Sequence, residues 1–93
     1  MAYEVVYWPA ADDALSALEK DPALAPALQA VERILLELEA DPFNPRLGTT
    51  AFMTEDYGGV SATPARLDDW YVLWQRGAEQ GVIEILLVHQ IRI

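Results

Sequence analysis

The stretch DWYVLWQRGAEQGVIEILLVHQIRI, residues 69–93, determines how the rest of the chain can fold. Two runs rich in β-branched, aromatic and aliphatic residues, 70–75 and 82–93, flank the polar, glycine-containing segment 76–81. Strand-forming residues on either side of a short loop with glycine predict a β-hairpin. Because the loop is longer than two residues, we expect a bulged or longer turn rather than a tight one.

Apolar residues occupy both faces of each predicted strand. In the first run Trp70, Val72 and Trp74 alternate with Tyr71 and Leu73, and the second run alternates aliphatic residues in the same way. A strand with one solvent-facing side would alternate apolar and polar residues. We therefore expect central strands that are covered on both sides, or on one side plus a partner protein.

The segment before the hairpin supplies helices that can cover one face. Residues 3–8 (YEVVYW) form a short β-rich run that stops at a proline, and a helix is predicted over about 10–20. A second, longer helix is predicted over about 26–40, where leucine, isoleucine and valine repeat at helical spacing. Asp21-Pro22 joins the two helices into a hairpin with a very short connection.

The order of the predicted elements indicates the fold class. Residues 41–50 (DPFNPRLGTT) read as a loop, and 52–59 is either a strand or a loop that packs on the sheet. Residues 60–66 predict a modest strand whose Pro64 favours an edge position or a strand end. The single domain 1–93 then has the order β-α-α-β-β-β. This order predicts an α+β fold with a helical hairpin packed on one face of a small, mainly antiparallel sheet.

The chain is strongly acidic. Fifteen acidic residues oppose six basic ones, for a formal net charge of −9 and an isoelectric point near 4.2. A chain with this charge is repelled by phosphate backbones at long range, so general affinity for nucleic acids is disfavoured. The simplest interpretation is that the acidity provides solubility.

Several classes of protein are not expected from the composition. With no cysteine and one histidine, the chain lacks the ligands of thiolate or histidine metal centres, and it has no cofactor-binding motif. No apolar run approaches the ~20 residues needed to cross a bilayer. The N-terminus lacks the basic region of a signal peptide. We expect a cytoplasmic protein with no cofactor, no metal and no membrane contact.

Three motifs resemble the RelE/ParE superfamily of type II toxins. They are Asp-Pro-Phe-Asn-Pro-Arg-Leu at 41–47, Trp-Tyr-Val-Leu-Trp at 70–74 and Ile-Leu-Leu-Val-His-Gln at 85–90. The resemblance implies a toxin encoded beside an antitoxin that wraps it. Some members of the superfamily cleave mRNA in the ribosomal A site, and others poison DNA gyrase. A bound antitoxin would also cover the second apolar face of the sheet.

The chain departs from the superfamily at several positions. Ribosome-dependent members are typically basic, whereas this chain is acidic. Tyr71 stands where an arginine is common, and Gln90 follows the histidine where arginine is frequent. The chain also ends at Ile93 without the C-terminal tyrosine that is common in nucleolytic members.

Metal-independent RNA cleavage needs a group that activates the 2′-hydroxyl, cations that stabilise the phosphate, and an acid for the leaving oxygen. His89 is the candidate acid or base, and Arg66 is the candidate phosphate-binding group. Together they form the predicted catalytic pair. Arg46, Tyr71 and Arg92 are the candidate substrate-binding residues.

Each of these candidates also has a structural interpretation. His89 can be a packed core histidine, and Arg66 can pair with Asp68 or Asp69. Arg92 and Arg76 can be surface charges. By strand parity Glu84 faces away from His89, which disfavours a direct dyad. The aromatic residues are expected in the core rather than on an RNA-stacking platform: Phe43, Phe52, Tyr57, Trp70 and Trp74.

Two classes of function remain open from the sequence. The first is the toxin of a type II toxin–antitoxin system, acting either as a ribosome-dependent endoribonuclease (an mRNA interferase) or as a gyrase inhibitor. The second is a non-catalytic protein of the same fold that acts through protein–protein binding or as a homo-oligomer. The apolar sheet face predicts either a homodimer or a complex with a partner.

Overall fold

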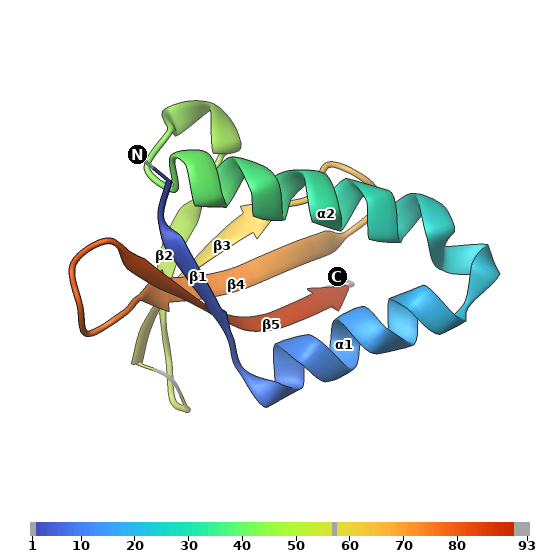
Figure 1. Cartoon of the computed structure of the whole chain (residues 1–93), viewed down its shortest axis with the longest axis horizontal. Coiled ribbons are helices and arrows are strands. Elements are labelled where there is room, and N and C mark those ends of the chain that lie inside the picture. The colour runs from blue at the N-terminus through green and yellow to red at the C-terminus, as the bar shows by residue number, and fades with distance from the viewer. Residues whose placement is uncertain (1, 57, 91–93) are drawn as a thin grey trace.

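The computed structural model describes residues 2–56 and 58–90 and shows two helices packed on a five-stranded sheet (Figure 1). The sheet order is β1-β5-β4-β3-β2, with β1 parallel to β5 and the other neighbours antiparallel. This confirms the predicted α+β class and the helical hairpin. The elements are β1 (Glu4–Tyr7), α1 (Pro9–Lys20), the 3-10 turn η1 (Pro22–Leu24), α2 (Ala25–Ala40), the 3-10 turn η2 (Pro45–Leu47), β2 (Thr50–Thr54), β3 (Gly58–Pro64), β4 (Trp70–Arg76) and β5 (Val82–Gln90).

The helices begin and end close to where the sequence predicts. Pro9 occupies the first turn of α1, where its missing N–H costs nothing, and Asp12 lies at the positive end of the helix dipole. The Asp21 carboxylate accepts a hydrogen bond of 3.0 Å from the backbone N–H of Ala23. This capping contact starts η1, which leads directly into α2. The hairpin therefore turns within the predicted Asp21-Pro22 connection.

The undecided segment after the helices is a strand. β2 covers Thr50–Thr54 and pairs antiparallel with β3. Four strands therefore follow the helices instead of three. The sheet ends at β2, which makes β2 an edge strand, while β3 lies one position further in. Pro64 is the last residue of β3, in agreement with a strand end.

The main core lies between the helices and one face of the sheet, which we call the helix-side face. Val31 and Leu38 of α2 are fully buried against it. The sheet contributes buried side chains from its two central strands: Val72 and Trp74 from β4, and Ile83, Ile85 and Val88 from β5. Both strands lie inside the sheet, as the two-sided apolar pattern predicts.

A β-bulge interrupts the pairing of β4 with β5. Leu73 is opposite Leu87, but the next residue of β4, Trp74, is opposite Ile85, so Leu86 is an extra residue. The extra residue reverses the alternation along β5. Glu84 is opposite Gln75 and His89 is opposite Tyr71, and these two β4 residues share one face.

The prediction that Glu84 faces away from His89 is therefore wrong, because it assumes a regular strand and the bulge adds one residue between them. Both residues face the side of the sheet opposite to the helices. Five positions along an extended strand still separate them by roughly 16 Å. A direct dyad is excluded by distance rather than by face.

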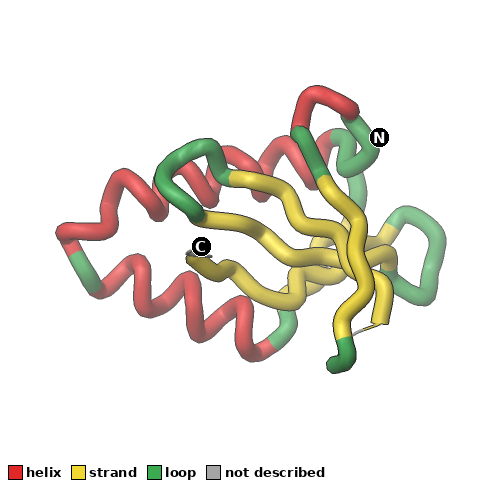
Figure 2. The backbone as a smooth tube through the Cα atoms, turned by 180° about the vertical axis from the view of Figure 1, so that it is seen from behind, coloured by secondary structure: helices red, strands yellow, loops and turns green. Residues whose placement is uncertain are grey.

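The second face of the sheet, which we call the open face, has no helix over it in the described part of the chain (Figure 2). Its apolar side chains are nevertheless buried. Val60 is 3%, Ala62 is 5% and Leu73 is 9% exposed. Neighbouring side chains of the sheet thus cover much of the face for which the sequence predicts a covering partner. The most exposed large apolar side chains lie elsewhere, with Met53 at 78% and Leu36 at 67%.

Candidate functional site

His89 and Tyr71 lie together on the open face. Their Cα positions are direct partners in the β4–β5 pairing, so both side chains project from the same face. His89 is exposed and Tyr71 is half-buried. The alternative that His89 is a packed core residue is therefore wrong, because the bulge and the end of the strand leave it at the surface.

Arg66 and Arg46 form a second pair at a different place. Arg66 has a positive φ of 62° in the connection between β3 and β4, and its guanidinium donates a hydrogen bond to the backbone carbonyl of Arg46. Arg46 belongs to η2, which begins where the Asn44 side chain accepts a hydrogen bond of 3.0 Å from the Arg46 N–H. Both arginine side chains are exposed.

The two pairs do not converge on one site. Arg66 lines a cavity with α2 residues, including Gln29 and Glu37, so it lies on the helix side of the sheet. His89 and Tyr71 face the other way. Arg92, the third predicted substrate-binding residue, lies outside the described residues.

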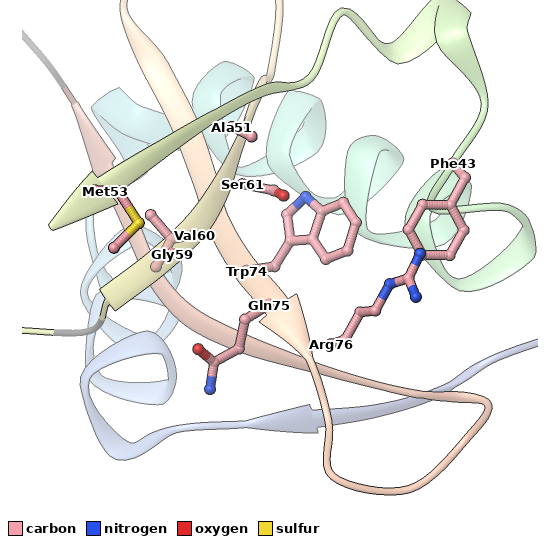
Figure 3. Close-up of a pocket in the computed structure, with 9 residues that line it drawn as sticks. All are labelled: Phe43, Ala51, Met53, Gly59, Val60, Ser61, Trp74, Gln75 and Arg76. Atoms are coloured by element: carbon pink, nitrogen blue, oxygen red, sulfur yellow. The ribbon is translucent and has the colours of Figure 1, made fainter.

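A cavity of about 560 Å³ opens on the helix-side face beyond the end of α2 (Figure 3). Its walls are Phe43, from the loop after α2, and Trp74 of β4, whose rings meet edge to face with centroids 5.9 Å apart. The Arg76 guanidinium lies 4.5 Å above the Phe43 ring centroid, within the range of a cation–π contact. Ala51 and Met53 of β2 form the opposite rim.

The sequence predicts a core position for both aromatic walls of the cavity, Phe43 and Trp74, and this is right for only one of them. Trp74 is 2% exposed and belongs to the core, but Phe43 is 46% exposed. Phe43 follows Asp41-Pro42, whose Asp41 carboxylate accepts a hydrogen bond of 3.2 Å from the Phe43 N–H. The Asp-Pro-Phe sequence indicates such a turn, and a turn presents its third residue at the surface. Tyr57 and the side chain of Phe52 lie outside the part of the chain that the structure describes.

Polar side chains of β4 and β5 form a short network with Trp8, the residue between β1 and α1. The Glu84 carboxylate accepts hydrogen bonds from Gln75 Nε2 at 2.8 Å and from Trp8 Nε1 at 3.2 Å, through the same oxygen, Oε1. Two donors on one carboxylate oxygen hold the three side chains in a fixed arrangement. This arrangement identifies Glu84 as a structural acceptor.

The described residues offer neither a metal site nor a membrane-spanning helix. Among residues 2–56 and 58–90, no three histidine or acidic side chains gather where they could hold a metal ion. Neither α1 nor α2 combines the length and the apolar character that a membrane span requires.

No protein-family model matches the sequence, and no curated protein matches it. Solved structures do match over almost the whole chain. The YoeB/ParE toxin from Agrobacterium tumefaciens has a TM-score of 0.75 at 9% identity, covering 96% of this chain and 99% of the other. The RelBE2 toxin–antitoxin complex from Mycobacterium tuberculosis contains a chain with a TM-score of 0.66 at 21% identity, covering 98% and 100%. The archaeal RelE–RelB complex from Pyrococcus horikoshii OT3 contains one with a TM-score of 0.67 at 16% identity, covering 97% and 96%.

These likenesses define the class of fold, which is that of the small toxins of toxin–antitoxin systems. More specifically, the chain has the RelE/ParE fold, and this confirms the fold that the resemblance implies. At identities of 9–21% the match rests on the arrangement of the elements rather than on shared side chains.

Proposed function

We propose that this chain is the toxin of a type II toxin–antitoxin pair. The observation that carries the proposal is the extent of the structural match. This chain and the Agrobacterium toxin superimpose over 96% of this chain and 99% of the toxin. The toxin would act in the cytoplasm, where its targets are found.

The proposed partner is an antitoxin encoded beside the toxin. Two of the matching solved structures are complexes, the RelBE2 toxin–antitoxin complex and the archaeal RelE–RelB complex. The net charge of −9 adds a chemical requirement. A segment that binds this toxin should carry basic residues, because like charges across an interface oppose association.

Within this proposal, we favour action by protein–protein binding, as in gyrase inhibition, over cleavage of mRNA. Cleavage needs cations beside the acid–base group, where they can stabilise the phosphate in the transition state. The described candidate cations Arg46, Arg66 and Arg76 lie on the helix side, whereas His89 and Tyr71 lie on the open face. A nucleolytic site would have to draw its cation from elsewhere.

Growth of a bacterium expressing the chain tests the proposed function. We expect growth to stop on induction, and to resume when the neighbouring small gene is expressed as well. A soluble, well-expressed product that leaves growth unimpaired would contradict the toxin assignment. The antitoxin assignment fails separately if growth stops and no neighbouring gene relieves it.

The mode of action is tested by His89→Ala and Arg66→Ala, with Arg33→Ala as a matched exposed-arginine control. Binding predicts that all three variants remain toxic and that mapped mRNA 5′ ends show no new cuts. Inhibition of DNA supercoiling by purified gyrase is the positive readout for the gyrase branch. Folded His89→Ala or Arg66→Ala protein that has lost toxicity, while Arg33→Ala keeps it, would establish the cleavage branch instead.

A further inference from the structure

The outer side of β2 is a free strand edge that has no feature to prevent pairing with another strand. β2 is last in the sheet order, so within the described residues no other strand lies beside it. Its sequence, Thr-Ala-Phe-Met-Thr, contains no charged residue and no proline. Edge strands of monomeric proteins usually carry a lysine, a proline or a bulge that prevents pairing with another chain. β2 has none of these protections.

The cavity described above lies directly beside this edge, on the same face as the exposed side chains of β2. Ala51 and Met53 form its rim, and Met53 is 78% exposed. A strand added beside β2 would carry its own alternate side chains over this cavity, because neighbouring strands keep the same alternation of faces. The cavity is therefore placed to receive an apolar side chain from an added strand.

Charges of opposite sign lie at the two ends of β2. Exposed Glu55 and Asp56 follow the strand directly. At the other end lie the exposed Arg46 and Arg66, held together by the hydrogen bond from Arg66 to the Arg46 carbonyl. An antiparallel copy of the same segment would bring its acidic end to this basic end, and its basic end to the acidic one.

We propose that a second copy of this chain pairs with β2 to form a symmetric dimer with a continuous sheet. Identical strands related by a two-fold axis run antiparallel, and an axis at Phe52 places Ala51 opposite the partner's Met53. The partner's Met53 then covers the rim of the cavity. The same register places Glu55 opposite the partner's Thr49, which is three residues along the chain from the partner's Arg46.

The net charge of −9 on each chain opposes this association only at long range. At physiological salt the Debye length is about 8 Å, so charges far from the interface are screened while the facing acidic and basic ends remain close. A second copy pairs with the free edge, covers the rim of the cavity and brings opposite charges together. This inference does not depend on the proposed toxin function.

Sedimentation equilibrium of the purified chain, at physiological salt and up to on the order of 100 μM, tests the proposal. We expect a mass near twice the 10.4 kDa of one chain. Met53→Lys should raise the dimer dissociation constant at least tenfold, because a lysine on the edge opposes strand pairing. Leu36→Lys is the matched control, since Leu36 is also highly exposed but lies on α2.

The outcomes separate the occupants of the edge. A monomer over the whole concentration range would overturn the proposal, as would a dimer that Met53→Lys and Leu36→Lys weaken equally. A monomer that binds the antitoxin more weakly when it carries Met53→Lys would assign the edge to that partner instead.

Disulfide trapping tests the register, because the natural chain has no cysteine. Residues directly opposite each other in antiparallel strands have Cα atoms about 4.5–5.5 Å apart, within the range of a disulfide. Ala51→Cys mixed with Met53→Cys should therefore cross-link under mild oxidation at least tenfold faster than either variant alone. Equal rates in the mixture and in the separate variants would contradict the register.

Charge reversal provides a test that includes rescue. Arg46→Glu should weaken the dimer, because it places a carboxylate against the partner's acidic turn. Adding Glu55→Lys to the same chain should restore the dimer. Failure of the second change to restore it, in a protein that remains folded, would show that these ends do not face each other.

Discussion

The two faces of the sheet differ in how they are buried. The helix-side face packs against α1 and α2 and contains side chains with no exposed surface, among them Val72, Ile83 and Ile85. The open face buries Val60, Ala62 and Leu73 without a helix, and it is bordered by polar side chains such as Glu84 and Gln75. The difference shows that apolar side chains in a strand can be buried by their neighbours on the same face. A two-sided apolar pattern therefore does not require a second covering layer.

Matched leucine truncations give the largest expected effects and test this comparison. Leu38→Ala on α2 should lower the free energy of unfolding by about 4 kcal/mol, because its 0% exposed site is enclosed by helix and sheet and leaves a cavity. Leu73→Ala should cost about 2 kcal/mol, because the open face can relax toward the removed side chain. Chemical denaturation monitored by circular dichroism measures both. Equal costs would mean that the open face is packed as tightly as the helix-side face.

The buried hydroxyl of Thr63 gives an effect of intermediate size. Trp74 Nε1 donates to Thr63 Oγ1 at 2.9 Å, and Thr63 also shares a hydrogen bond of 2.7 Å with Thr49. Trp74→Phe should lower the free energy of unfolding by about 1–2 kcal/mol, from the lost hydrogen bond and the smaller ring. Thr63→Val should cost about as much, because it leaves the indole N–H unsatisfied.

A double-mutant cycle of these two variants isolates the hydrogen bond from the packing. The coupling energy should be about 1 kcal/mol. Strictly additive costs would show that the bond between indole and hydroxyl contributes nothing to stability.

Tyr7, at the margin of the helix-side face, gives the smallest effect. Burial raises the pKa of Tyr7 above its ordinary value, and the nearby carboxylates of Glu39 and Asp12 raise it further. Because the folded state holds the phenol proton more tightly, the associated stability is fully present below about pH 10, the pKa of an unfolded tyrosine. It is lost as the pH rises through the raised pKa.

Unfolding curves of the natural chain and Tyr7→Phe, from pH 8 to pH 11, measure this loss. The natural chain should lose more stability above about pH 10 than Tyr7→Phe does. Parallel loss in both proteins would assign the alkaline destabilisation to other groups.

Most of the fold is predictable from the sequence because its main elements carry strong patterns. The helical spacing of leucine and valine in α2 indicates a helix directly. The two long apolar runs of β4 and β5 indicate strands in the same way. β2 is harder to predict because Thr-Ala-Phe-Met-Thr is short and lies between two glycines, Gly48 before it and Gly58 after it. Its strand conformation depends on pairing with β3, which local sequence does not encode.

The candidate site is less predictable, because its residues are placed by tertiary features. The positive φ of Arg66 directs that side chain to the Arg46 carbonyl, and no nearby glycine indicates such a turn. The side of the sheet that His89 and Glu84 share depends on the bulge at Leu86. Whether His89 and Arg66 take part in chemistry stays a prediction.

The extra residue in β5 also determines how this strand would respond to the loss of one residue. Deleting Leu86 would remove the bulge and make the pairs on either side of it, Ile85 with Trp74 and Leu87 with Leu73, directly consecutive. Val88 would stay opposite Val72 in the core, and His89 would stay opposite Tyr71 on the open face. The loss of a single codon at this position would thus leave the inside and the outside of β5 unchanged. The same loss in a regularly paired strand such as β3 would exchange the two faces of every residue beyond it. Deletions should therefore be tolerated at the bulge of β5 and excluded from the middle of β3.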